Sequence, residues 1–180
     1  MHWLLLFRHN NYDEVMRKSS RFINSFFLQL SNGLLVKGGS IQKHDEKHVS
    51  AVLNVFSRRF IFSKLHSRIY LDLYIDKMHM CAIYGDVEED DFHKIATYIS
   101  HVLDIVIVDL PLLRILKVFN NNGVKVVVEG KEYTVNEVDT SVLSSIHSIV
   151  VGNTTIKKRC ACSPDRNMLK KVMEVVLNES

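Results

Sequence analysis

Apolar and polar residues alternate most regularly between positions 68 and 75. The apolar members share one face of an extended chain: Ile69, Leu71, Leu73 and Ile75. The polar members share the other face: Arg68, Tyr70, Asp72 and Tyr74. This period of two predicts a half-buried β-strand, and Asp76-Lys77 predicts a tight turn into a return strand over 78–84. Residues 60–65 are predicted to add a third strand.

Apolar residues at helical spacing predict helices elsewhere in the chain. The predicted helices cover residues 12–24, 44–59, 88–106, 112–119 and 165–177. In the second of them, spacings of 3, 1 and 3 relate four apolar residues, Val49, Val52, Leu53 and Phe56. A sixth helix is predicted to begin at Asn136 and to carry Val138, Val142, Ile146 and Ile149.

Turn residues predict two hairpins and two irregular segments. Asn32-Gly33 separates predicted strands over 25–30 and 34–37, and Asn-Gly is the strongest short hairpin signal. Glu129-Gly130 separates strands over 124–128 and 131–135. Gly38-Gly39-Ser40 is predicted to break the chain, and residues 157–164 to form a basic, cysteine-containing loop. A short apolar run, Trp3 to Phe7, predicts a buried strand.

These elements predict an α/β protein of the α+β kind. We expect a mostly antiparallel sheet of about five strands with helices packed on it, and a small C-terminal helical extension. The expected organisation is an N-terminal strand and helix in 1–24, a core in 25–123, and a hairpin with C-terminal helices in 124–180, packed on the same core. The last helix docks on this domain or on a partner; internal docking is favoured because few other helices cover the second sheet face.

Composition places the chain among ordinary globular proteins. Of its 180 residues 47% are hydrophobic and 24% charged, with only 2 Pro and 7 Gly. A formal net charge of +3 is too balanced to indicate a nucleic-acid binder. Three cysteines without framework spacing indicate a reducing compartment, and no run approaches a membrane span of about 20 apolar residues. We therefore expect a cytoplasmic protein without a signal peptide, any contact with membranes being peripheral only.

One dipeptide suggests catalysis. Arg8-His9 follows a predicted strand, and it resembles the opening of the histidine phosphatase family, in which a strand leads into Arg-His-Gly. Asn10 replaces that Gly, and no second Arg-His site is apparent. A strand end with solvated polar residues is the favoured interpretation. A second segment, the apolar run 104–109 that ends in Asp, is similar to the magnesium-binding strand of nucleotide-binding proteins. The sequence contains no phosphate-binding glycine loop such as Gly-x-x-x-x-Gly-Lys, so nucleotide binding is not predicted. No catalytic residue and no cofactor are predicted.

Two spacings suggest zinc, and neither completes a site. His44 and His48 would lie on one face of the predicted helix, without a third ligand nearby. Cys160 and Cys162 form a Cys-x-Cys that only Cys81 or His147 could complete. A solvated helix start and a pair of reduced thiols are the favoured interpretations, so no metal is predicted.

Two surfaces are candidates for binding. Tyr70 and Tyr74 lie on the polar face of their strand, and tyrosine is enriched at binding hot spots. The alternative, weighted equally, is that a helix of the same domain covers both. A basic cluster could meet an anionic membrane surface, RNA or an acidic protein, although a solvated surface is favoured. Its members are Lys157, Lys158, Arg159, Arg166, Lys170 and Lys171.

The order of elements over residues 25–125 resembles the longin superfamily of trafficking proteins. The similar parts are the hairpin over 26–36, the segment 44–59, the strand pair 69–85 and the helix 88–106. Helix 12–24 departs from the simplest longin. It is similar to the roadblock arrangement, or else Met1–Phe7 is the first longin strand and the helix an insertion. These families share no catalytic residues, so none is carried over.

The resemblance implies a non-enzymatic protein–protein interaction scaffold. We expect a subunit of a hetero-oligomeric complex in vesicle trafficking or GTPase regulation, with protein partners. The alternative is an RNA- or ribosome-associated protein that uses the basic residues of 157–171. A phosphatase-like enzyme that uses Arg8 and His9 is the third possibility.

Overall fold

The protein consists of two compact units that share one strand. The computed structural model describes residues 1–59, 62–74, 80–119, 123–135 and 145–178. The larger unit is Leu5–Val108, and the smaller unit combines Met1–Leu4 with Asp109–Ser180. Strand β1 (His2–Arg8) contributes its first residues to the smaller unit and its last residues to the larger one.

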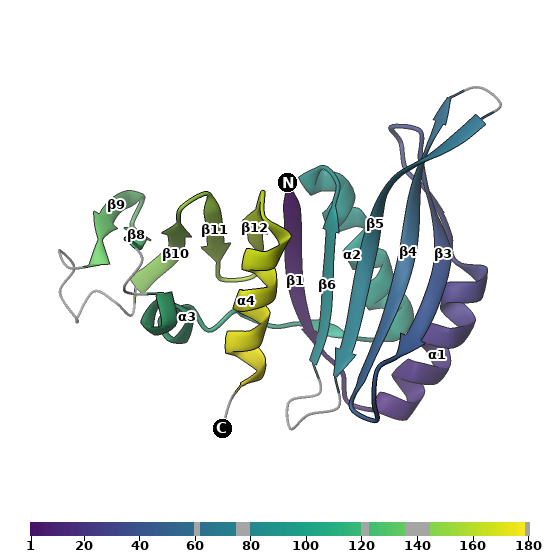
Figure 1. The fold of residues 1–180 in the computed structure, drawn as a ribbon, viewed down its shortest axis with the longest axis horizontal. Helices are drawn as coiled ribbons and strands as arrows, with labels where there is room; N and C mark the ends of the chain where they lie inside the picture. Colours follow the sequence, from purple (N-terminus) through teal and green to yellow (C-terminus); the bar gives the residue numbers. More distant parts are fainter. Residues whose placement is uncertain (60–61, 75–79, 120–122, 136–144, 179–180) are drawn as a thin grey trace. The chain divides into compact units, whose positions relative to one another are not determined.

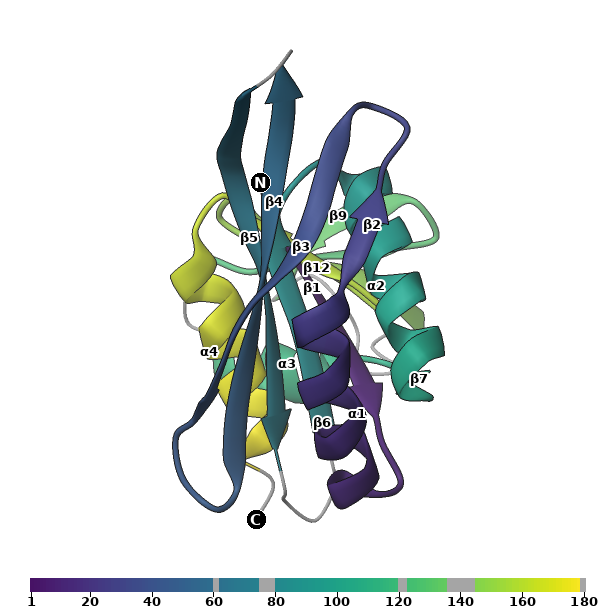
Figure 2. The same ribbon diagram turned by 90° about the vertical axis from the view of Figure 1, so that its right-hand side faces the viewer.

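The larger unit is a sheet whose strand order is β2-β3-β4-β5-β6-β1. Its strands after β1 are β2 (Phe27–Gln29), β3 (Leu34–Lys43), β4 (His48–Arg59), β5 (Phe62–Tyr74), β6 (Met80–Asp86) and β7 (Val106–Ile107). Neighbours from β2 to β6 are antiparallel, and β7 pairs with β1. The helices are α1 (Tyr12–Ser25) and α2 (Glu89–Leu103), and they lie on the same side of this sheet (Figure 2).

The core of the larger unit lies between those helices and one sheet face. Cross-strand pairs put apolar residues opposite each other, as in Leu53 with Ile69 and Leu71 with Ile83, and these side chains are almost fully buried. Helix α2 buries four large side chains at helical spacing: Phe92, Ile95, Ile99 and Leu103. Helix α1 packs on β3 and β4 and begins at Asn11, whose side chain accepts a hydrogen bond from the N–H of Glu14.

The smaller unit consists of antiparallel strands and two helices. Its strand order is β1-β12-β11-β10-β8-β9. The strands are β8 (Lys125–Val128), β9 (Lys131–Thr134), β10 (Ile146–Val151), β11 (Thr154–Lys157) and β12 (Ala161–Ser163). Helix α3 (Leu112–Phe119) packs on β10 and on α4 (Arg166–Leu177), which packs on β12 (Figure 1). The core includes Ile149, Ile156, Val126 and Val172, each fully buried.

Several predicted elements are confirmed. The strand at Trp3–Phe7, the helix at 12–24 and the alternating strand at 68–74 all form. Both hairpins form, with Gly33 and Gly130 at positive φ in their turns. The C-terminal helix forms after Asp165, and it buries its predicted stripe of Leu169, Val172, Met173 and Val176. The predicted turn at Asp76-Lys77 and the predicted helix start at Asn136 lie outside the described residues.

The helix predicted over 44–59 is wrong, because this segment contains strand β4. The buried positions are Val49, Ala51, Leu53 and Val55, which alternate. The helical spacing mixed residues of both faces: Val52 and Phe56 are half-buried on the opposite side of the strand. Apolar residues at every other position, from Val49 to Val55, were the better signal.

Three irregular or helical segments were also assigned wrongly. Gly38 does not break the chain; it lies in β3 at a register shift, where an added Cβ would collide with the carbonyl oxygen of Ile23. Residues 146–149, predicted to be helical, are in β10. Residues 157–164 are not one loop. Strand β11 ends at Lys157, and β12 begins at Ala161. The turn between these strands is closed by a hydrogen bond from the N–H of Lys157 to the carbonyl of Cys160 at 2.8 Å.

The predicted fold class is therefore wrong in scale. The described residues form twelve strands and four helices, not a sheet of about five strands with helices packed on it. The predicted small C-terminal helical extension is also wrong, because the described residues of 124–180 form the five strands β8 to β12 and only one helix, α4. The predicted organisation into 1–24, 25–123 and 124–180 stays a prediction. The two compact units of the structure meet in the sequence between Val108 and Asp109.

The packing of α2 gives a first prediction. Replacing Ile99 by Ala removes a fully buried side chain and leaves a cavity beneath the helix. We expect the free energy of unfolding to fall by about 2–5 kcal/mol in urea denaturation. The matched control is Val118→Ala on α3, where the side chain is 57% exposed and the change should stay within about 0.5 kcal/mol. An equal response of both variants would contradict the packing.

Candidate interaction sites

Strand β2 forms an open edge of the larger unit's sheet. Backbone bonds join Leu30 to Leu34 and Phe26 to Gly38, and the ladder pairs Leu28 with Val36. In an antiparallel ladder the intervening residues point their N–H and C=O groups to the other side. Phe27 and Gln29 therefore direct these groups away from β3. Within the described residues, no hydrogen bond occupies them.

A groove of about 710 Å³ runs between this edge and helix α2. Leu28 and Leu30 line it from β2, and the face of α2 supplies His93, Lys94, Thr97, Tyr98 and His101. No acidic residue is among the lining side chains, so the groove combines an apolar floor with a wall that carries one basic side chain, Lys94. An edge that lacks a neighbour thus lies beside a groove with room for side chains.

Contacts at both ends hold α2 against the β2 region. At the start of the helix, the side-chain amide of Asn32 donates to Asp91 at 2.5 Å. Further along, the ring of Tyr98 meets the ring of Phe26 edge to face, with centroids 5.5 Å apart. Phe26 in turn packs on Phe22 of α1 at 4.5 Å. The width of the groove is consequently set by the fold rather than by a ligand.

A second site lies on the opposite face of the sheet, around the carboxyl group of Asp72. Its side chain is buried, and both oxygens accept hydrogen bonds. Nε2 of His48 lies 2.8 Å from Oδ1, and the hydroxyl of Tyr84 donates to Oδ2. The β4–β5–β6 register brings these three residues together from separate strands. Chemically, such a carboxylate fixes the orientation of the imidazole that bonds to it.

Aromatic rings enclose the imidazole of His48. The ring of Tyr74 stacks on one side at a centroid distance of 4.5 Å, and His44 stacks at 4.4 Å. His44 is fixed by Ser50, whose Oγ lies 2.5 Å from Nε2. These contacts make the His48–Asp72 pair part of a packed cluster.

The turn beside this cluster is closed by Asp45. The backbone N–H of Lys47 donates to its carboxylate at 2.6 Å and lowers the pKa of Asp45, and the N–H of His48 adds a second bond at 2.8 Å. Because the pKa of Asp45 is lower in the folded state than in the unfolded state, its hydrogen bonds stabilise the fold at pH values above the ordinary pKa of Asp. The contribution is lost as the pH falls through the lower, folded-state pKa.

The predicted tyrosine interface lies on this same face. Tyr70 stacks on Tyr84 with ring centroids 5.7 Å apart, and Tyr74 stacks on His48. Both are half-buried. The helices of the larger unit, α1 and α2, pack on the other face of its sheet (Figure 2). Contact of a partner with Tyr70 and Tyr74 stays a prediction.

The predicted basic cluster is distributed over two elements of the smaller unit. Lys157, Lys158 and Arg159 are exposed at the β11–β12 turn. Lys158 and Arg159 form ion pairs with Asp109 at 3.5 and 3.3 Å. Arg166, Lys170 and Lys171 lie on α4, where the two lysines are exposed and Arg166 is half-buried. Asp109 therefore offsets part of the positive charge of the three basic residues at the β11–β12 turn.

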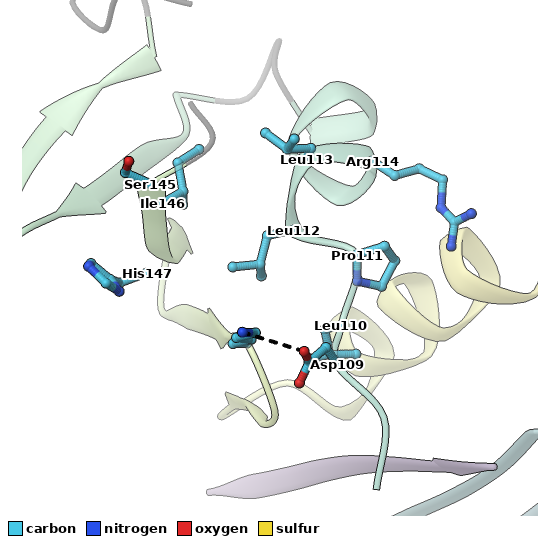
Figure 3. A pocket seen from close by; sticks show the side chains of 10 residues that line it. Asp109, Leu110, Pro111, Leu112, Leu113, Arg114, Ser145, Ile146 and His147 are labelled. Atoms are coloured by element: carbon cyan, nitrogen blue, oxygen red, sulfur yellow. Dashed lines mark ion pairs between the residues drawn. The ribbon is translucent and has the colours of Figure 1, made fainter. Parts of the chain in front are cut away.

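A pocket of about 550 Å³ lies beside that ion pair, within the smaller unit. Figure 3 shows Leu112 directed into it between α3 and β10, while His147 and Arg114 point away. Its remaining lining comes largely from Pro111, Leu110 and Ile146. The pocket is mainly apolar and offers a single ion pair at its margin.

The residues considered for catalysis and metal binding lie at three different places in the fold. His9 is 1% exposed, its Nε2 3.3 Å from the carbonyl of Tyr74, whereas Arg8 is exposed at the end of β1. His44 and His48 do not share a helix; they meet across the β3–β4 turn. In the described part of the chain, no three His, Cys, Asp or Glu residues are grouped to hold a metal ion. Neither Cys160 nor Cys162 forms a disulfide bond among the described residues.

None of the helices in the described residues combines the length and apolar character needed to cross a membrane.

Sequence comparison adds no family to this description. No protein-family model matches the chain, and none of the curated proteins compared with it is significantly similar. The candidate sites are therefore judged on geometry alone.

The Asp72 cluster gives a second prediction. Tyr84→Phe removes one donor from a carboxylate that is only 5% exposed. We expect the free energy of unfolding to fall by about 1–3 kcal/mol, because a buried acceptor then lacks a partner. Tyr133→Phe, at a half-buried tyrosine of β9, is the control and should change stability by less than about 0.5 kcal/mol. Urea denaturation of both variants at one pH makes the comparison; equal stabilities would show that Tyr84 does not support Asp72.

Proposed function

We propose that this chain is a non-enzymatic protein-binding module whose partner supplies an extended segment that adds to the open edge of β2. The single observation that carries the proposal is the pairing of a free strand edge with a preformed groove. Main-chain groups of Phe27 and Gln29 offer hydrogen bonds to any extended peptide, and the groove beside them offers a place for side chains.

The alternation of a strand explains how both features act together. An extended segment bonded to β2 directs every second side chain toward the face that carries α2. Those side chains meet Leu28, Leu30 and Tyr98. Because the groove exists in the free protein, binding requires little rearrangement of the module, and the ordering cost falls mainly on the partner segment.

Charge defines the partner segment further. The groove wall carries Lys94, with His93 and His101 on the same helix, and no lining residue is acidic. A partner segment with apolar residues at alternate positions and carboxylates toward α2 is the best match. The open edge also needs such an occupant, since an exposed strand edge is otherwise a template for unwanted pairing. Phe27, 59% exposed on β2, increases that tendency.

Two more specific functions, membership of a trafficking complex and association with RNA, have fewer structural observations in their support. Membership of a trafficking or GTPase-regulating complex follows only from the resemblance to longin and roadblock proteins, and the strand-addition proposal does not depend on it. An RNA-associated role would use the basic cluster, where Asp109 already neutralises part of the charge. The β2 groove therefore supports protein binding better than the cluster supports RNA binding.

A third prediction tests the edge of β2. The purified chain is screened against a display library of random peptides, each about 12 residues long, and enriched peptides should alternate apolar residues with Asp or Glu. Gln29→Pro removes an N–H that faces away from β3, so the β2–β3 ladder remains. We expect it to weaken binding of a selected peptide about tenfold in a titration, as loss of one or more edge bonds implies.

The controls separate the edge from the side chains. Gln29→Ala keeps the N–H and should bind the peptide like the parent chain. Lys94→Glu should weaken binding of acidic peptides, while Lys117→Glu on α3, outside the groove, should not. Amide hydrogen exchange should slow at Phe27 and Gln29 when peptide is bound. Enriched peptides that bind Gln29→Pro as well as the parent would refute strand addition.

A further inference from the structure

One stretch of the chain differs from the rest in charge. Residues 47–71 contain no Asp or Glu, although the chain has 20 acidic residues in 180. The same stretch contains five Lys or Arg, and four of them fall close together: Arg58, Arg59, Lys64 and Arg68. The basic residues flank an apolar run, Phe60-Ile61-Phe62. Charge and apolar residues are thus concentrated in one short segment.

This segment forms a hairpin that extends beyond its neighbours in the sheet. β4 and β5 pair from His48–Tyr74 to Arg59–Phe62, but β6 accompanies β5 only as far as Ile69. β3 accompanies β4 as far as Ser57. On the β5 side, residues 62–68 therefore pair with β4 alone, a length of about 20 Å. Figures 1 and 2 show the ends of β4 and β5 projecting past the other strands of the larger unit.

The described end of the hairpin exposes large apolar side chains. Phe62 is 81% exposed, the highest value for any large apolar residue in the described part of the chain, and Leu65 is 41% exposed. Contact of a partner with both side chains would remove this exposed apolar surface from water. Phe62 and Leu65 are therefore the apolar groups that the described end of this hairpin offers to a partner.

Arg58 and Lys64 flank this apolar end, and Arg68 lies farther along β5, opposite Asn54. All three are exposed, and among the described residues none of them forms an ion pair. Their charge is therefore available to an outside partner. The basic cluster of the smaller unit differs in this respect, because Lys158 and Arg159 are paired with Asp109.

We infer that the β4–β5 hairpin is a peripheral membrane-contact site that inserts Phe62 and Leu65 among lipids while its cationic residues bind anionic headgroups. An apolar tip with a basic collar fits the interface of a bilayer, where apolar side chains enter the acyl boundary and Lys or Arg remain at the headgroups. Each Lys or Arg at an anionic surface strengthens binding about fivefold. This site is separate from the β2 groove, and it gives the proposed protein-binding module a location on a membrane.

Chemistry favours a membrane over a nucleic acid as the partner. Single-stranded nucleic acid is held by aromatic rings that stack on successive bases along a basic groove. Leu65 has no stacking face, and the hairpin is a narrow two-stranded ribbon rather than a platform. The acidic start of α2, Glu88 to Asp91, lies outside the hairpin and would be repelled by anionic lipid. Repulsion there confines the membrane contact to the tip.

The experiment is co-sedimentation of the full chain with lipid vesicles. Vesicles of phosphatidylcholine with about 30% phosphatidylserine should bind the protein, and vesicles of phosphatidylcholine alone should bind it at least about tenfold more weakly. Raising the salt from about 0.1 to about 0.5 M should release it. Arg58→Glu with Lys64→Glu, and separately Phe62→Ser with Leu65→Ser, should each lower the partition coefficient more than about tenfold. Equal urea midpoints for parent and variants establish that the exposed substitutions leave the fold intact.

Two controls make the assignment decisive. Lys170→Glu with Lys171→Glu reverses the same charge on α4 and should leave vesicle binding unchanged. In a Trp3→Phe background, Phe62→Trp provides the chain's only tryptophan, and its emission should shift to the blue when phosphatidylserine vesicles are added. Loss of binding in the α4 variant, an unshifted emission of the Phe62→Trp variant, or binding of an oligonucleotide without binding of vesicles would each overturn the proposal.

Discussion

The pairing of β4 with β5 is the interaction on which the larger unit depends. Its register sets Leu53 against Ile69 and Val49 against Leu73, and these residues form the floor on which the helices pack. The same register places His48 beside Tyr74 on the other face, within reach of Asp72. A slip by one residue would exchange the two faces. It would turn the apolar floor away from the helices and the polar cluster toward them, so the core and the Asp72 site depend on one alignment.

Local patterns predicted those elements whose two faces differ most. The strand at 68–74 is an example, since strict alternation continues over its length and every predicted apolar position in the described part is buried. The segment 44–59 was wrongly predicted as a helix because Val52 and Phe56 are apolar residues on the less buried face of strand β4. A strand with apolar residues on both faces contains helical spacings by chance. Only a neighbouring strand decides between the two interpretations, and a neighbour is non-local information.

The candidate sites were harder to predict than the strands. Tyr70 and Tyr74 were identified on the correct face, but their stacking on Tyr84 and His48 depends on register and was not visible in the sequence. Asp72 could have been noticed as an acid within an apolar strand. The β2 groove has no local signal, because its two walls come from residues 28–31 and 93–101. The hairpin tip did have one, in the absence of acids between 47 and 71.

Strand β1 has a consequence for the order in which the chain can fold during synthesis. Its residue His2 pairs with Ser163 and Leu4 with Ala161, so residues 2–4 must wait until residues 161–163 have been made before their ladder can close. The larger unit needs only residues up to Val108. It can therefore fold on the ribosome while the first half of β1 still lacks its β12 partner. Closing so long a loop is slow, and the smaller unit remains open to misassembly until its final strand emerges.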